Sequence, residues 1–77
     1  MARGDIQARR VLARNVRRLR QLRDLSQEEL ADAAGVRQAQ VSEIESGKSN
    51  VTLDKLGRIA AALDVKLAEL FDDAKRG

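Results

Sequence analysis

Hydrophobic positions recur along this chain at the three- and four-residue spacing that places side chains on one face of a helix. The first stripe consists of Leu12, Val16 and Leu19, and it predicts a helix over about residues 5–23. No clear stripe precedes Leu12, so we expect residues 1–11 to form an Arg-rich arm or an extension of that helix. The chain has no Pro, so helix ends must be read from Gly, Ser, Asn and shifts in the hydrophobic pattern.

Two short amphipathic helices meet at Gly35. The first begins with a capping box, in which the Ser26 hydroxyl accepts from the amide of Glu29 and the Glu29 side chain accepts from the amide of Ser26. A second helix is predicted over about residues 38–46, and Gly47 ends it. Two helices joined by a tight Gly-containing turn are typical of a helix-turn-helix, whose second helix fits the major groove of DNA.

The clearest helical stripe follows Thr52, which is an N-cap candidate. Its members are Leu53, Leu56, Ile59, Ala60 and Leu63. A fifth helix is predicted from Lys66 to about Lys75, with apolar residues at Leu67, Leu70 and Phe71. Five helices with short connections define a compact all-α domain. We assign residues 12–73 to this domain and residues 74–77 to a short tail.

Charge is distributed unevenly along the chain. Residues 1–24 carry eight Arg against two Asp, a net charge of +6, whereas residues 25–77 carry seven basic against ten acidic side chains, a net charge of −3. A basic segment on a weakly acidic domain favours a polyanionic partner, most often nucleic acid. The alternative is a solvated helix face that only keeps the domain soluble.

Composition excludes several classes of function. The 77 residues contain no Cys, His or Tyr, so disulfides, thiolate or imidazole metal sites and a nucleophile–base pair are not expected. We therefore predict no enzyme activity and no cofactor. Phe71 is the only aromatic residue, so the set of aromatic side chains that stacks on single-stranded RNA is missing. No apolar run approaches a membrane span and no signal peptide opens the chain, so we expect a soluble cytoplasmic protein associated with DNA.

The order of these elements resembles the lambda-repressor-like, Cro-type (XRE-like) helix-turn-helix family. Over about residues 12–71 the matching motifs are Val16-x-x-Leu19-Arg20, Leu25-Ser26-Gln27-Glu28-Glu29-Leu30-Ala31, Gly35-Val36, Val41-Ser42-x-Ile44-Glu45-x-Gly47-Lys48, Leu53-x-x-Leu56-x-x-Ile59-Ala60-x-Ala62-Leu63 and Val65-x-Leu67-x-x-Leu70-Phe71. The resemblance implies a five-helix lambda-repressor-like domain with its helix-turn-helix in helices 2 and 3. It also implies a sequence-specific transcriptional regulator of prokaryotic or phage type, a repressor acting as a homodimer on a palindromic operator in double-stranded DNA.

The resemblance further implies which residues face the bases: Gln38, Ala39 and Glu43. Gln can bond adenine N6 and N7 together, Ala can contact a thymine methyl and Glu can accept from cytosine N4. Our hypothesis is that Gln38 favours an adenine and Ala39 a neighbouring thymine. Glu43 is less suited to DNA because phosphates repel a carboxylate, and Arg37 or Lys48 is its alternative partner.

Other positions match residues that bind or flank the DNA backbone: Gln27, Gln40, Ser42, Lys48 and Ser49. Arg20 and Glu45 match a structural Arg–Glu pair, with Arg20 facing a phosphate as the alternative. Arg37 departs from the family because a Ser or Thr normally caps the recognition helix there, a loss of about 0.5–2 kcal/mol. An Arg at this position has the reach for a phosphate or a guanine. Lys66 likewise replaces the small residue that usually caps the last helix of the family, and Val51 stands where the family commonly has Pro.

Two further hypotheses concern protein partners. A dimer face is expected on the apolar C-terminal surface, formed by Phe71, Leu67, Leu70 and Val51, although Leu67 and Leu70 also fit a role in the monomer core. The alternative function is an antitoxin-type module that binds a toxin and represses its own operon, and the lack of a long extra tail counts against it.

Overall fold

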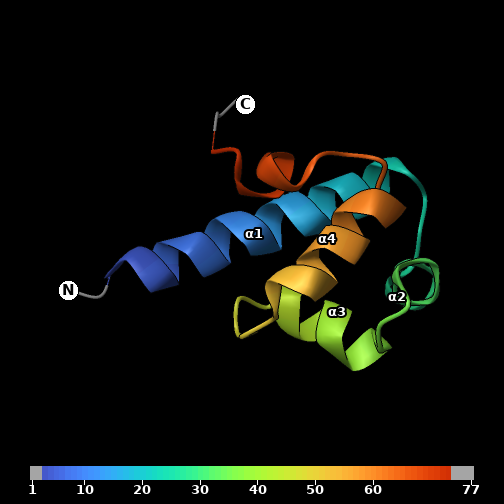
Figure 1. The fold of residues 1–77 in the computed structure, drawn as a ribbon, viewed down its shortest axis with the longest axis horizontal. Coiled ribbons are helices and arrows are strands. Elements are labelled where there is room, and N and C mark those ends of the chain that lie inside the picture. Colours follow the sequence, from blue (N-terminus) through green and yellow to red (C-terminus); the bar gives the residue numbers. More distant parts are fainter. Residues whose placement is uncertain (1–2, 74–77) are drawn as a thin grey trace.

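The computed structural model describes residues 3–73, and every regular element in this part of the chain is helical (Figure 1). The elements are α1 (Arg3–Leu22), α2 (Gln27–Ala34), α3 (Gln38–Glu45), α4 (Leu53–Ala62) and the 3-10 helix η1 (Leu67–Phe71). α1 packs against α3 and η1, while α2 packs against α3 and α4. This architecture confirms the predicted all-α class. No helix among the described residues is long and apolar enough to cross a bilayer.

The core consists of aliphatic side chains from all five elements. Its largest fully buried members are Leu30, Ile44, Ile59, Leu63, Leu70, Val16 and Val41. Burying each such side chain stabilises the fold by about 1.5–3 kcal/mol. The predicted stripes therefore correspond to the core, except at Leu53, which is 70% exposed. Leu53 is the first residue of α4, and helical side chains lean toward the N-terminus, so it projects beyond the packed part of the helix.

Local signals in the sequence define the helix ends. The Ser26 hydroxyl accepts from the Glu29 amide at 3.0 Å, and Glu29 Oε1 accepts from the Ser26 amide at 2.8 Å, which confirms the capping box. Gly35 ends α2 in the left-handed conformation at φ 71°, where a residue with a Cβ is strained. Thr52 caps α4 by accepting from the Lys55 amide at 3.2 Å. These predictions are confirmed.

The predicted fifth helix is wrong in type and length. The chain forms a 3-10 helix over Leu67–Phe71, and the backbone is extended again at Asp72. The Asn15 side chain explains this ending, because its Nδ2 donates to the carbonyl oxygens of Leu70 and Asp72, both at 2.9 Å. These carbonyls are bonded to α1 in place of the amides of a following helical turn. The predicted tail, residues 74–77, lies outside the described part of the chain.

α1 begins earlier than the hydrophobic stripe indicated. Residues from Arg3 onward are helical, so the described part of the predicted arm is a continuous extension of α1. Val11 is buried on this extension. Arg14 reaches from the next turn to Asp73, with Nη2 2.7 Å from Oδ1, in an exposed ion pair. α1 thus contacts the segment after η1 as well as α3.

We predict that the Asn15 side chain stabilises the junction between α1 and η1. Asn15→Ala leaves the carbonyl of buried Leu70 without its donor, so the free energy of unfolding is expected to fall by about 1–3 kcal/mol in urea denaturation. Gln21→Ala, at an exposed position of the same helix, is the control and is expected to change it by less than about 0.5 kcal/mol. Equal effects of the two substitutions would contradict this role.

Candidate nucleic-acid interface

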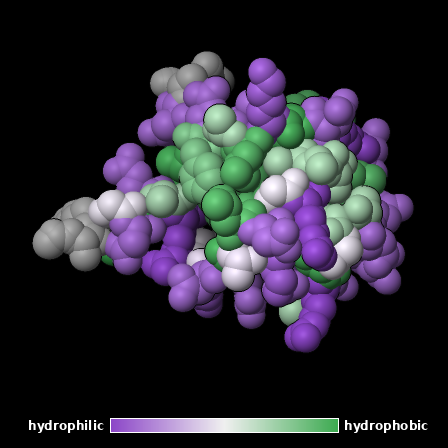
Figure 2. All heavy atoms as spheres, in the orientation of Figure 1, coloured by the Kyte–Doolittle hydropathy of each residue, from purple (hydrophilic) through white to green (hydrophobic). Residues whose placement is uncertain are grey.

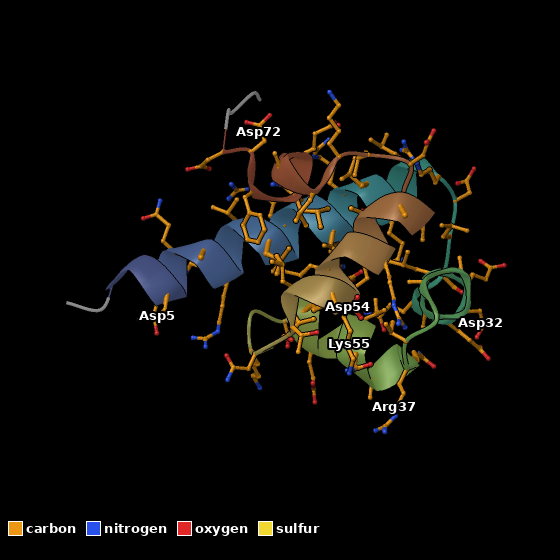
Figure 3. The ribbon with its side chains drawn as sticks, in the orientation of Figure 1. Asp5, Asp32, Arg37, Asp54, Lys55 and Asp72 are labelled. Carbon is orange, nitrogen blue, oxygen red and sulfur yellow. The ribbon has the colours of Figure 1, made fainter. Side chains whose placement is uncertain are left out.

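The two faces of α3 differ sharply in exposure. Val41 and Ile44 are buried against the core. The opposite face exposes the side chains of Gln38, Ala39, Ser42 and Glu43. Figure 3 shows that Arg37, just before α3, points outward from the end of the molecule. α3 is therefore held by its apolar side and presents a row of small and polar groups to solvent.

The start of α3 is closed by Gln40. Arg37 occupies the N-cap position with an extended backbone, and its guanidinium has no acceptor atom with which to cap the helix. Gln40 Oε1 accepts from the Arg37 amide at 3.1 Å instead. This bond uses the carbonyl oxygen of Gln40 and leaves its two N–H donors. The Arg37 side chain is exposed and bonds to no other described residue.

A nearly buried ion pair joins α1 to the end of α3. Arg20 Nε lies 2.6 Å from Glu45 Oε2, and Arg20 Nη2 lies 2.9 Å from Glu45 Oε1. Their side chains are only 13% and 4% exposed. The hydrogen bonds that Arg20 donates to Glu45, together with the negative charge of that carboxylate, raise the pKa of Arg20 above its ordinary value despite the burial. Arg20 Nη1 also donates to the carbonyl of Leu25 at 2.8 Å. Arg20 therefore serves as the structural partner of Glu45.

Gln27 extends this network to the first residue of α2. Its Nε2 donates to Glu45 Oε1 at 3.1 Å, so one of its two N–H groups remains. The backbone amides of Gln27 and Glu28 belong to the first turn of α2, where no helical acceptor precedes them. These amides lie at the positive end of the helix, which suits an anion, and the Gln27 side chain starts from the same turn.

The loop after α3 contains the other expected backbone-binding residues. Gly47 has φ 77°, which turns the chain out of the helix. Lys48 follows with its side chain exposed, and its amide donates to the carbonyl of Glu43 at 3.0 Å. Ser49 is half-buried, and its carbonyl oxygen accepts from Arg9 Nε at 3.0 Å. This loop is thus connected to α1, a link that the sequence analysis missed.

The alternative partners of Glu43 are not where the sequence analysis expected them. Among residues 3–73, neither Arg37 nor Lys48 lies within ion-pair distance of the Glu43 carboxylate. Glu43 is exposed on the outer face of α3, so its carboxylate is available to an external donor.

The four residues of the expected dimer face have different environments. Phe71 is 41% exposed, whereas Leu70 is fully buried and belongs to the monomer core, which corrects its assignment to the surface. Leu67 and Val51 are partly buried and pack on that core. Figure 2 shows apolar atoms gathered in the middle of this view, over the region where η1, α1 and α4 meet in Figure 1.

A shallow depression lies beside Phe71. It is lined by Gly4, Gln7, Ala8, Val11, Phe71 and Asp73. The apolar surface around Phe71 therefore extends onto the N-terminal half of α1. The hydrophobic pattern gives no sign of this extension, because small residues such as Ala8 form no recognisable stripe.

The chain is similar to known proteins over most of its length. The family model described as Helix-turn-helix matches residues 16–70. Control protein C.SmaI of Serratia marcescens is 38% identical over 61 residues, which are 79% of this chain and 73% of that protein. Control protein C.MunI of a Mycoplasma species is 43% identical over 53 residues, 69% and 72% of the two chains.

Among solved structures, the restriction-modification controller protein C.AhdI from Aeromonas hydrophila has a TM-score of 0.79 and 36% sequence identity, with coverage of 82% of this chain and 96% of that one. The residues that the family model matches include α2 and α3.

We predict that the Arg20–Glu45 pair is required for stability. Glu45→Ala leaves a nearly buried guanidinium without its carboxylate, and the free energy of unfolding is expected to fall by about 3–5 kcal/mol in chemical denaturation. Asp54→Ala is the matched control, because it removes the carboxylate of an exposed ion pair, in which Asp54 Oδ2 lies 3.4 Å from Arg58 Nη2. Its expected cost is at most about 1 kcal/mol. A Glu45 variant as stable as the control would refute the prediction.

Proposed function

Because this chain belongs to the helix-turn-helix family and is a DNA-binding transcriptional regulator, we propose that it binds duplex DNA with α3 in the major groove. The observation that carries the proposal is the exposed polar face of α3, which is backed by buried Val41 and Ile44 and fastened at its end by Glu45. A helix with one solvent-facing row of polar side chains has the width and chemistry to read base edges in that groove.

Base reading is assigned to three residues on this face. Gln38 pairs with an adenine through N6 and N7, and Ala39 contacts a neighbouring thymine methyl. Glu43 accepts from a cytosine N4. The exposure of all three side chains supports the proposal, and so does the lack of an ion-pair partner for Glu43 within residues 3–73.

Phosphate contacts are assigned to the groups that border α3. The free N–H of Gln27 and the first amides of α2 bind one phosphate, and Lys48 and Ser49 bind another from the loop. Arg37 reaches a phosphate at the start of α3, with Gln40 and Ser42 flanking it. Arg20 acts indirectly, because three of its N–H groups are already bonded to Glu45 and Leu25.

We further propose a homodimer, with Phe71 and the neighbouring surface of α1 at its interface, on a two-fold symmetric operator. The partly exposed Phe71 and the adjacent depression support this surface. Two copies related by a two-fold axis would present two copies of α3 to successive half-sites of the DNA.

The similarity to the restriction-modification controller protein C.AhdI and to the control proteins C.SmaI and C.MunI supports a corresponding biological role. We propose that this chain regulates restriction-modification genes. It would act as a repressor that occupies an operator near their promoter, in the cytoplasm of a prokaryotic cell. The control-protein relatives do not favour the antitoxin alternative, and we propose neither a toxin partner nor a catalytic role.

The base-reading proposal is tested by selecting bound duplexes from randomised DNA. Gln38→Ala is expected to lose the preference for adenine at one position of each half-site, a discrimination of about 1–3 kcal/mol. Gln21→Ala, which replaces an exposed Gln on α1, is the control and should select the wild-type sequence. If Gln38→Ala also selects the wild-type sequence, Gln38 does not read a base.

The dimer proposal is tested by sedimentation. Phe71→Asp places a charge in the apolar interface, which would have to be desolvated on association, so monomers with unchanged helicity are expected. Ile6→Asp is the control, since Ile6 is 49% exposed on α1 and does not line the depression beside Phe71. A Phe71→Asp protein that remains dimeric would rule out this interface.

A further inference from the structure

The segment between α3 and α4 has little backbone structure of its own. Within residues 3–73, Ser49, Asn50 and Val51 take part in no backbone–backbone hydrogen bond. Val51 is anchored by its side chain, which packs against the core. The loop that contains Lys48 and Ser49 therefore needs another restraint between Gly47 and Val51.

Arg9 supplies that restraint. Its Nε donates to the carbonyl oxygen of Ser49 at 3.0 Å, and its Nη2 donates to Asn50 Oδ1 at 3.2 Å. On the other side, Nη1 lies 3.4 Å from Asp5 Oδ2, one helical turn earlier. The planar guanidinium thus bonds two adjacent loop residues while Asp5 orients it from α1.

α1 places the Arg9 guanidinium in line with a second structural arginine, Arg20. Arg9 and Arg20 are about three helical turns apart on the same side of α1. Arg20 bonds Glu45 at the end of α3, and Arg9 bonds the loop that follows α3. The two arginines therefore hold α3 and the loop to one continuous helix, which fixes the loop relative to α3.

We propose that Arg9 is a positioning residue for DNA binding, which orders the loop so that Lys48 and Ser49 meet a phosphate while α3 occupies the groove. This inference rests on the proposed function of the loop. In this proposal, Arg9 itself does not contact DNA. The guanidinium is engaged on the protein, and it holds the loop where Lys48 reaches its phosphate. Without Arg9, the cost of ordering the loop exceeds the gain from that contact, so the contact does not form.

The decisive comparison is between adjacent arginines. Arg9→Ala and Arg10→Ala each remove one positive charge from the same turn of α1, but Arg10 is exposed and bonds to no other described residue. Binding to a fluorescent duplex DNA of mixed sequence is measured across a range of salt concentrations. Arg9→Ala is expected to lose about tenfold in affinity, and Arg10→Ala threefold at most, roughly the effect of a distant charge.

The salt dependence separates positioning from overall stability. The slope of log affinity against log salt is expected to decrease by about one in Arg9→Ala, because the phosphate contact of Lys48 is lost. Arg10→Ala is expected to keep the wild-type slope. Adding Lys48→Ala to Arg9→Ala should reduce affinity no further, since both substitutions remove the same contact.

A charge-retaining variant tests whether the loss of affinity comes from the lost charge alone. Arg9→Lys keeps the charge but lacks the planar fork that bonds two loop acceptors, so its affinity is expected to lie close to that of Arg9→Ala. Full recovery in Arg9→Lys would overturn the proposal, and so would equal losses in Arg9→Ala and Arg10→Ala.

Backbone amide signals of Lys48–Val51 in the DNA-free protein provide an independent readout. They are expected to shift and to exchange faster with solvent in Arg9→Ala, and to stay unchanged in Arg10→Ala. Unchanged loop signals in Arg9→Ala would refute the positioning role directly. If Lys48→Ala alone leaves DNA affinity unchanged, the proposed phosphate contact of the loop fails, whatever the amide signals show of Arg9.

Discussion

The ion pair between Arg20 and Glu45 connects the first three helices of the domain. It joins α1 to α3, and the additional bonds to Leu25 and Gln27 bring the α1–α2 turn and the start of α2 into the same network. Such a pair is costly to desolvate, so it persists only because both oxygens of the carboxylate are bonded. Its geometric effect is to fix the end of α3 against the first turn of α2, the two places from which DNA contacts are proposed.

α1 has a second function besides closing the core. Three of its polar residues, Arg9, Asn15 and Arg20, bond respectively to the loop after α3, to the backbone at the end of η1 and to α3 itself. Each bond starts from a different turn of one continuous helix. A small domain without disulfides has few ways to hold loops in place, and here side chains of a single helix restrain three separate segments.

At the start of the recognition helix α3, another side chain takes the place of the missing N-cap. The usual hydroxyl cap is missing because Arg37 stands at that position, and Gln40 closes the first turn from within the helix. The exchange leaves a cation at the entrance of α3, exposed and free of protein partners in the described chain. A neutral cap would only stabilise the helix, whereas the Arg side chain adds a group with the reach for DNA.

Much of this protein was determined by the sequence itself. The helix stripes, the capping box at Ser26 and the turn at Gly35 are local patterns whose physics acts within a few residues, and the structure follows them. Other features depend on contacts between residues that are far apart in the chain. η1 stays a short 3-10 helix because Asn15, 55 residues away from Leu70, binds the carbonyl that a longer helix would use. Arg9 bonds a loop 40 residues away because α1 continues as one helix from Arg3 to Leu22, and hydrophobic spacing contains no information about such a contact.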